Sequence, residues 1–366
     1  MNDFSNKVIN YAFRVNDYDS DKLGQYIREN YTEENRAALI EDAKRRKVLP
    51  VVGKLMVLQN VDVDYWTHQY EYYRKRNQEV TELMDQIFSV FLAEGIYEIC
   101  VYENYGALLA SGTDIALYSS GDVDLFANIA QKDKIEQVLA VFEYYPTNDF
   151  NNKQGICTEY LKNQGIIRIN IAWKPLIRYS LPIKSGFEKY FFWDKMHYYK
   201  NTTIRLPTAE TLLYLCFLRI AVHGYSRSPD IRLYIDTFNA SCTNPDWNCV
   251  IEWAKSDGVY TKFATVAAIA HDLIGLEIPE PVLLFAQTDK FAQRILMQTY
   301  NFNEHLLKYD LSGIHLLKVE AASDNRSVIG EILNMLFPPK EWIKEYYQNE
   351  NENMMDAYKR YYKRLL

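Results

Sequence analysis

The spacing of apolar and polar residues predicts a chain that is helical at both ends and mixed in the middle. Residues 1–79 are mostly polar and predict helices over 33–57 and 64–76. Apolar residues at three- and four-residue spacing then predict an amphipathic helix over 80–92. Gly95 closes this helix, because glycine after the last periodic residue is typical of a helix end.

Strand and helix patterns alternate across residues 80–175. Branched and aromatic residues predict a strand over 96–102, and Gly106 opens a short apolar helix. A second strand is expected at 122–126, followed by a helix over 132–144. This alternation is typical of an α/β or α+β domain.

Two further strands, 157–161 and 166–173, are expected to pair as a hairpin around the turn Asn163-Gln164-Gly165. Strand signals vanish after Pro207, and the later helices are expected at 209–223, 231–239, 247–255, 260–274 and 354–366. We therefore expect three parts, an N-terminal helical segment 1–79, an α/β domain 80–205 and a C-terminal helical domain 206–366.

Composition and charge narrow the function classes. Of the 366 residues, 41 are Lys or Arg and 48 are Asp or Glu, so the net charge of −7 makes nucleic acid an unlikely partner. Basic clusters at 44–47 and 74–76 are interpreted as solvated helix faces.

The five cysteines include no C-x-x-C pair, which suits reduced thiols in a cytoplasmic protein. No signal peptide and no apolar run of about 18 residues is seen, so no membrane span is expected. The 30 tyrosines suit a core or an interface with a protein partner.

The candidate chemistry lies in Gly121-Asp122-Val123-Asp124. Strand alternation places Asp122 and Asp124 on the same face, where two carboxylates can share a hard divalent cation such as Mg²⁺. Asp-x-Asp occurs four times in the chain, but only this copy follows a glycine-led helix and a Ser-Ser-Gly turn. The alternative is a pair of carboxylates that merely solvate a strand end.

The order helix, strand, Gly-Ala-Leu-Leu, turn, Gly-Asp-Val-Asp-Leu, helix resembles the polymerase-β-like nucleotidyltransferases, and is most similar to their uncharacterised bacterial branch. The resemblance extends to the strand 169–173, the helical region 207–239 and the segment 335–339. It implies an α+β fold in which a mixed sheet with helices is flanked by N-terminal helices and a C-terminal helical domain.

The resemblance also implies a reaction and its residues. Asp122 and Asp124 would bind Mg²⁺, and Gly106 would let the triphosphate of a nucleoside triphosphate approach the backbone. Ser120, Gly121 and Arg168 would be further nucleotide-binding positions. The family transfers a nucleoside monophosphate from the triphosphate to an acceptor hydroxyl, and pyrophosphate leaves.

Four positions depart from the family pattern. Asn170 and Ala172 stand where the family usually has a third carboxylate and a histidine, and Tyr105 and Tyr118 stand where it favours lysine and arginine. Asn170, the degenerate third catalytic position, can offer a carbonyl oxygen to a metal but cannot act as a base.

Two residues are candidates to replace the missing groups. Glu159 would lie beside Asn170 if the predicted hairpin forms, although the face it occupies depends on the register. Arg168 alternates with Asn170 and either contacts phosphate or remains a surface charge. Arg232 and Asp236 lie four residues apart and are interpreted as an ion pair on one helix face, and His223 as a buried or capping residue.

Two functions follow. The first is a Mg²⁺-dependent nucleotidyltransferase acting on an acceptor hydroxyl of a small molecule, a sugar or a protein. The second is a catalytically inactive protein of the same fold that acts as a nucleotide sensor or a protein-interaction scaffold.

Overall fold

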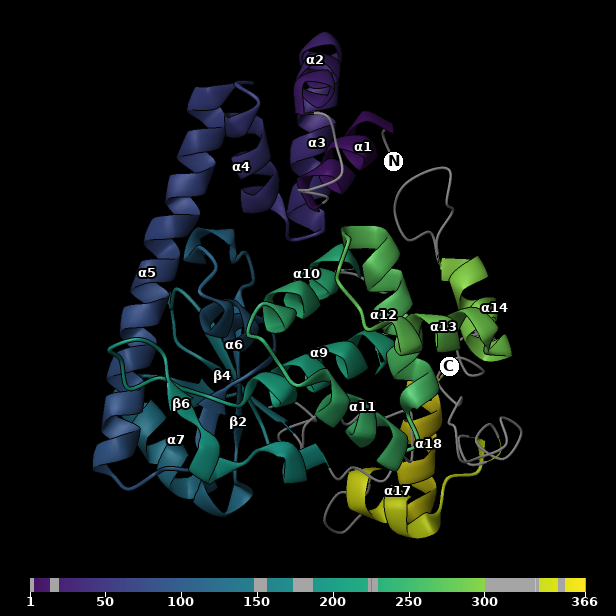
Figure 1. Cartoon of the computed structure of the whole chain (residues 1–366). Coiled ribbons are helices and arrows are strands. Elements are labelled where there is room, and N and C mark those ends of the chain that lie inside the picture. The colour runs from purple at the N-terminus through teal and green to yellow at the C-terminus, as the bar shows by residue number, and fades with distance from the viewer. Residues whose placement is uncertain are drawn as a thin grey trace.

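The computed structural model describes residues 3–13, 20–147, 157–173, 187–222, 225, 230–299, 333, 336–347 and 353–365. Within them the fold is α+β, with a mixed five-stranded sheet covered by helices (Figure 1). No helix in these ranges is both long and apolar enough to cross a membrane. His223 and Met335, which entered the sequence predictions, lie outside the described residues.

The central sheet has the strand order β1-β2-β5-β4-β3. Its strands are β1 (Ile99–Val101), β2 (Asp122–Ala127), β3 (Tyr145–Pro146), β4 (Cys157–Leu161) and β5 (Arg168–Ala172). β2 and β5 are parallel and the other neighbours are antiparallel, so the sheet is mixed. The predicted hairpin of β4 and β5 is confirmed. A second, two-stranded sheet pairs β6 (His197–Tyr198) with β7 (Arg205–Leu206).

The N-terminal helices are α1 (Asp3–Phe13), α2 (Ser20–Asn30), α3 (Glu33–Arg45), α4 (Leu49–Leu58) and α5 (Val63–Ala93). The helices expected at 64–76 and 80–92 are one continuous helix, α5, which runs along the edge of the molecule (Figure 1). The polar residues between the two predicted segments do not break it, because they are compatible with helix. The boundary expected between residues 79 and 80 therefore falls inside α5.

The middle of the chain adds α6 (Glu103–Ser111), α7 (Lys132–Val141) and the short 3₁₀ helices η1 (Ile115–Leu117), η2 (Ile129–Gln131), η3 (Phe187–Tyr190) and η4 (Trp193–Lys195). The helix predicted to open at Gly106 begins three residues earlier, at Glu103. One face of the sheet is apolar: Val123, Leu125, Ile169 and Ile171 pack in one core with residues of α5 and α7.

The opposite face of the sheet is divided. At one end Phe126 of β2 and Ala172 of β5 pack against Phe191 and against Leu215 of α9. The other end carries the polar side chains of Asp122, Asp124, Glu159, Arg168 and Asn170, as alternation along the strands requires. The sheet thus offers one polar end to the helices that follow it.

The C-terminal helices are α9 (Ala209–Val222), α10 (Asp230–Ser241), α11 (Trp247–Ser256), α12 (Tyr260–Ile274), α13 (Glu280–Thr288), α14 (Lys290–Thr299), α17 (Lys340–Tyr347) and α18 (Met354–Leu365). One continuous core joins the N-terminal helices, through Leu39 and Val52, to Phe217 of α9 and Phe263 of α12. Because this burial is the main stabilising term, the first four helices are part of the same packed body as α9–α14. α17 and α18 pack on each other around Tyr347 and Tyr361.

Candidate active site

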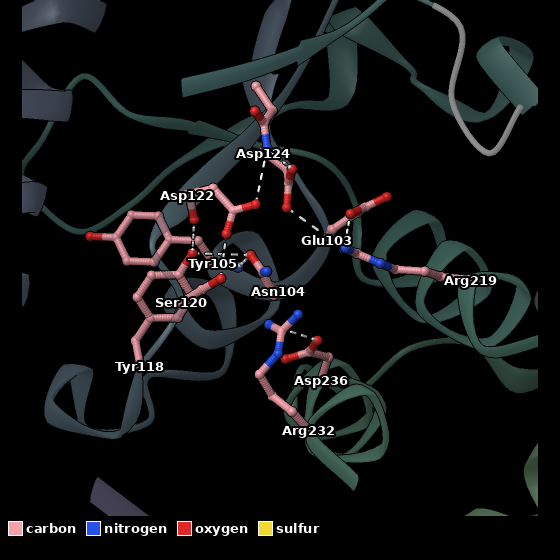
Figure 2. Close-up of polar contacts among 11 residues, drawn as sticks. Glu103, Asn104, Tyr105, Tyr118, Ser120, Asp122, Asp124, Arg219, Arg232 and Asp236 are labelled. Atoms are coloured by element: carbon pink, nitrogen blue, oxygen red, sulfur yellow. Dashed lines mark hydrogen bonds and ion pairs between the residues drawn. The ribbon is translucent and has the colours of Figure 1, made fainter. Parts of the chain in front are cut away.

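The two aspartates of β2 and Asn170 of β5 converge at the polar end of the sheet. Parallel pairing places Asp124 directly opposite Asn170. The Nδ2 of Asn170 donates to Asp122 Oδ2 at 3.0 Å and to Asp124 Oδ1 at 3.1 Å. The carboxylates point into the space faced by α6, α9 and α10 (Figure 2). The sequence prediction that both aspartates share one face is confirmed.

The register settles where Glu159 and Arg168 lie. Glu159 is paired with Asn170 across β4 and β5, so it faces the same side of the sheet as the aspartates. Its Oε1 binds Arg168 Nη1 at 3.1 Å, and Arg168 Nε lies 3.4 Å from the carbonyl oxygen of Gly121. Glu159 is therefore beside the site and is paired with Arg168; its role as a substitute carboxylate stays a prediction.

The turn before β2 is held in place by hydrogen bonds. The buried Ser120 hydroxyl donates to Asp122 Oδ1, and the Tyr118 hydroxyl donates to the carbonyl oxygen of Asp122. From α5, Arg76 Nη2 donates to the carbonyl oxygen of Ser120 at 2.5 Å. These contacts fix the direction in which Asp122 leaves the turn.

Arg219 of α9 joins the carboxylate cluster from the other side. It pairs with Glu103, and its Nη1 lies 3.6 Å from Asp124 Oδ2. Glu103 is buried and begins α6 at a φ of 54°, a left-handed conformation that is uncommon for residues other than glycine. Burial, and then the like charge of Arg232, lowers the pKa of Arg219 to about 10.

The carboxylate of Asp124 is buried at the polar end of the sheet. Burial, reinforced by the charge of Asp122, raises its pKa to about 7, and the hydrogen bond from Asn170 opposes the rise. Its Oδ2 has no hydrogen-bond partner among the described residues. A bound cation would favour the ionised form of this carboxyl, because opposite charge opposes the rise in pKa that burial causes.

These residues fit one hard divalent cation. Asp122, Asp124 and the amide oxygen of Asn170 are the oxygen ligands that Mg²⁺ takes, and Mg²⁺ commonly uses only one or two protein carboxylates beside water and phosphate. Exposing the amide oxygen requires Asn170 to rotate from the orientation in which Nδ2 faces both aspartates. Within the described ranges, no three His, Cys, Asp or Glu side chains are placed to hold a metal ion together.

Residues 25–275 match the family model described as uncharacterised nucleotidyltransferase, which is more than half of the chain. The chain belongs to this nucleotidyltransferase family. No curated protein and no solved structure matches the chain significantly.

Two of the departures from the nucleotidyltransferase pattern are side chains in the core. Tyr105 is fully buried, its hydroxyl is 2.6 Å from Thr81 Oγ1, and it points away from the aspartates (Figure 2). Tyr118 packs against it, with ring centroids 4.8 Å apart. Neither tyrosine fills the space between Asp122 and Asp124, and neither offers a cation to phosphate.

Gly106 has a packing role that the sequence did not reveal. A Cβ at this position would lie 2.9 Å from the carbonyl oxygen of Val101, closer than real Cβ atoms approach. The glycine therefore lets α6 pack against the end of β1. Its role in the approach of a triphosphate stays a prediction.

Several cations and polar groups near the aspartates come from remote elements. Arg232 Nη1 lies 3.5 Å from Asp236 Oδ2, so the predicted ion pair is confirmed, and both side chains are buried near the site (Figure 2).

The interpretation of 44–47 as a solvated face is wrong for Arg46, which is buried, and for Lys47, which is half-buried and interacts with Asp122. Their positions depend on how α3 packs, which periodicity alone does not define.

Proposed function

We propose that the chain is a Mg²⁺-dependent nucleotidyltransferase that moves a nucleoside monophosphate from a nucleoside triphosphate to an acceptor hydroxyl. The observation that carries the proposal is the convergence of Asp122 and Asp124 on Asn170, with Asp124 Oδ2 accepting no hydrogen bond within the described part of the chain and Arg219 Nη1 3.6 Å away. Membership of the nucleotidyltransferase family supports a nucleotide as the substrate.

The residues of the chain have separable tasks in this reaction. Bound Mg²⁺ would neutralise phosphate charge and orient the triphosphate for in-line displacement. Asp122 and Asp124 would hold it, Ser120 orients Asp122 through its hydroxyl, and Asn170 would supply a neutral oxygen. The acceptor hydroxyl releases its proton to water, and its oxygen forms a bond to the α-phosphorus. The bond between that phosphorus and the oxygen bridging to the β-phosphorus breaks at the same time, and pyrophosphate leaves.

Thermal unfolding with each of the four ribonucleoside triphosphates, in Mg²⁺ and in chelator, tests the proposal. A ligand at about 100 times its Kd stabilises the fold by about 2.7 kcal/mol, which shifts the melting temperature measurably. We expect a Mg²⁺-dependent shift in the wild type, lost in Asp122→Asn and kept in Asp133→Asn, a control at an exposed aspartate of α7. Pyrophosphate release with candidate acceptors then measures turnover.

A second candidate is a catalytically inactive member of the family. Contacts within the protein favour this candidate, because they stabilise the negative charge of the two aspartates without a metal. Asn170 donates to both carboxylates, and Arg219 lies 3.6 Å from Asp124. The absence of a Mg²⁺-dependent shift with every triphosphate would contradict the enzyme and support this scaffold. A shift without pyrophosphate release on any acceptor would support a nucleotide sensor.

A further inference from the structure

A cavity of about 640 Å³ adjoins the candidate site between the N-terminal helices and the C-terminal helices. Leu55 of α4 and Ile235 of α10 contribute to its apolar walls. Lys47, Asn104 and Arg232 line it as well, and all three lie near β2: Lys47 and Arg232 interact with Asp122, and Asn104 accepts from Tyr118.

Two of these side chains present buried N–H groups that make no hydrogen bond with the described residues. Asn104 is 1% exposed, and its Nδ2 has no hydrogen-bond partner within the described ranges. Arg232 is 7% exposed, and its Nε and Nη1 make no hydrogen bond among those residues, although Nη1 lies 3.5 Å from Asp236 Oδ2 in the ion pair. A buried donor left unpaired costs about 1–3 kcal/mol, so an acceptor supplied by a ligand would be stabilising.

Lys47 adds a positive charge to the wall of the cavity that Asn104 and Arg232 line. It follows α3 at a φ of 57°, a position that helices usually give to glycine, and its carbonyl oxygen accepts from the Ser119 hydroxyl. Its ammonium group makes no ion pair with any described residue. Burial, and then the like charge of Arg232, lowers the pKa of Lys47, an effect that a bound anion would reverse.

We propose that Lys47, Asn104 and Arg232 form a phosphate-binding subsite that opens onto the aspartate pair. The inference rests on the proposed function and extends it, because Lys47, Asn104 and Arg232 then supply the phosphate contacts that Tyr105 and Tyr118 do not. The ligand is either the nucleoside triphosphate or a phosphorylated acceptor.

Phosphate fits the three groups better than a carboxylate does. All three present donors, and a phosphate group offers several acceptor oxygens with up to two negative charges. It can therefore bind these donors and a cation at Asp122 at the same time. The volume of the cavity lies within the range of about 300–1,000 Å³ typical of small-molecule sites, which leaves apolar wall for the organic part of the ligand.

The test measures binding in chelator, by thermal unfolding with ATP, inorganic tripolyphosphate and orthophosphate. We expect Lys47→Gln and Arg232→Lys to weaken binding about tenfold or more, as removal of a charge-assisted hydrogen bond does. Arg232→Lys keeps a positive charge beside Asp236, and Lys47 has no structural ion pair among the described residues, so both variants are expected to fold. The matched control is Lys44→Gln, at an exposed lysine of α3, the helix that Lys47 follows.

Weaker binding of ATP and tripolyphosphate in both variants assigns the subsite to the triphosphate. Weaker binding of orthophosphate alone assigns it to a phosphorylated acceptor. No binding of any of the three probes by the wild type, or unchanged binding in both variants, overturns the subsite. Asp122→Asn should keep metal-free binding, because the subsite does not use the metal. Absence of Mg²⁺-dependent turnover in the wild type, with Lys47-dependent binding intact, would contradict the proposed function alone.

Discussion

Arg219 lies between two buried carboxylates, paired with Glu103 of α6 and 3.6 Å from Asp124 of β2. The three residues come from three different elements, so the guanidinium links α9 to both α6 and the sheet. A single guanidinium thus faces the two carboxylates of Glu103 and Asp124. Substitutions at these positions test how much this charge pairing contributes to stability.

Arg219→Met is expected to lower the free energy of unfolding by about 3–5 kcal/mol, because it leaves the Glu103 carboxylate buried and unpaired. The double variant Glu103→Gln, Arg219→Met should recover most of the loss, since it removes the uncompensated charge. Urea unfolding of the wild type, both single variants and the double variant measures the coupling. A loss of less than about 1 kcal/mol in Arg219→Met would show that the pair is not buried as described.

Asn170→Asp restores the carboxylate of the family pattern and should make stability depend on Mg²⁺. In chelator it loses two hydrogen bonds to charged groups, each contributing about 1.5–3 kcal/mol, and adds a third negative charge. Excess Mg²⁺ should raise its urea midpoint more than that of the wild type. Asn170→Ala is the control, because it loses the donors without adding charge. Equal responses of the two variants to Mg²⁺ would contradict a cation site at Asp122 and Asp124.

Gly106→Ala should destabilise the fold by about 1–3 kcal/mol, because its Cβ has to displace the backbone of Val101. Gly121→Ala is a matched control, since the nearest atom to its Cβ would be Arg168 Nη2 at 3.7 Å. That contact is ordinary, and we expect a change within about 0.5 kcal/mol. Thermal unfolding of the two variants should separate them clearly, and similar losses would refute the packing role of Gly106.

Asp114 should make the fold sensitive to acid. Burial raises its pKa, but hydrogen bonds from Tyr70 and from the Ala116 amide, with the charge of Arg74, outweigh burial and lower it below the usual value. A carboxyl with a lowered folded-state pKa stabilises the fold above its unfolded pKa, and this contribution is lost as the pH falls through the folded pKa.

Asp114→Asn removes that contribution. The measurement is the urea midpoint from about pH 6 down to about pH 3, a range that spans the unfolded pKa of about 3.9. As the pH is lowered, the midpoint should fall less steeply in Asp114→Asn than in the wild type. Asp133→Asn, at an exposed position of α7, should follow the wild type. Parallel curves for all three proteins would show that Asp114 is not linked to folding.

Much of the fold could be predicted because the pattern is local. The stripe of α12 and the alternation of β2 each depend on neighbouring residues, and the predicted helix 260–274 has the observed bounds. The turn at Asn163–Gly165 set the pairing of β4 with β5. The shared face of Asp122 and Asp124 follows from the same alternation.

The surroundings of the aspartates could not be predicted, because they depend on packing between remote elements. Arg219 reads as an interruption of an apolar helix, and only the approach of α9 to α6 brings it to Glu103. Lys47 sits in a basic run that looks solvated, yet its carbonyl is bound by Ser119, 72 residues away in the chain. Nor did the sequence indicate the left-handed backbone of Glu103.

The continuity of α5 determines how the molecule can be divided. Arg76 and Asn77 lie on the half of the helix that precedes residue 80, and they bind the carbonyl oxygens of Ser120 and Tyr118. A fragment beginning at residue 80 would contain both aspartates and every strand among the described residues, but it would lack the donors that hold the turn before β2. The autonomous unit of this protein therefore has to include all of α5, and transplanting the sheet alone into another protein would carry over the two aspartates without the contacts that align them.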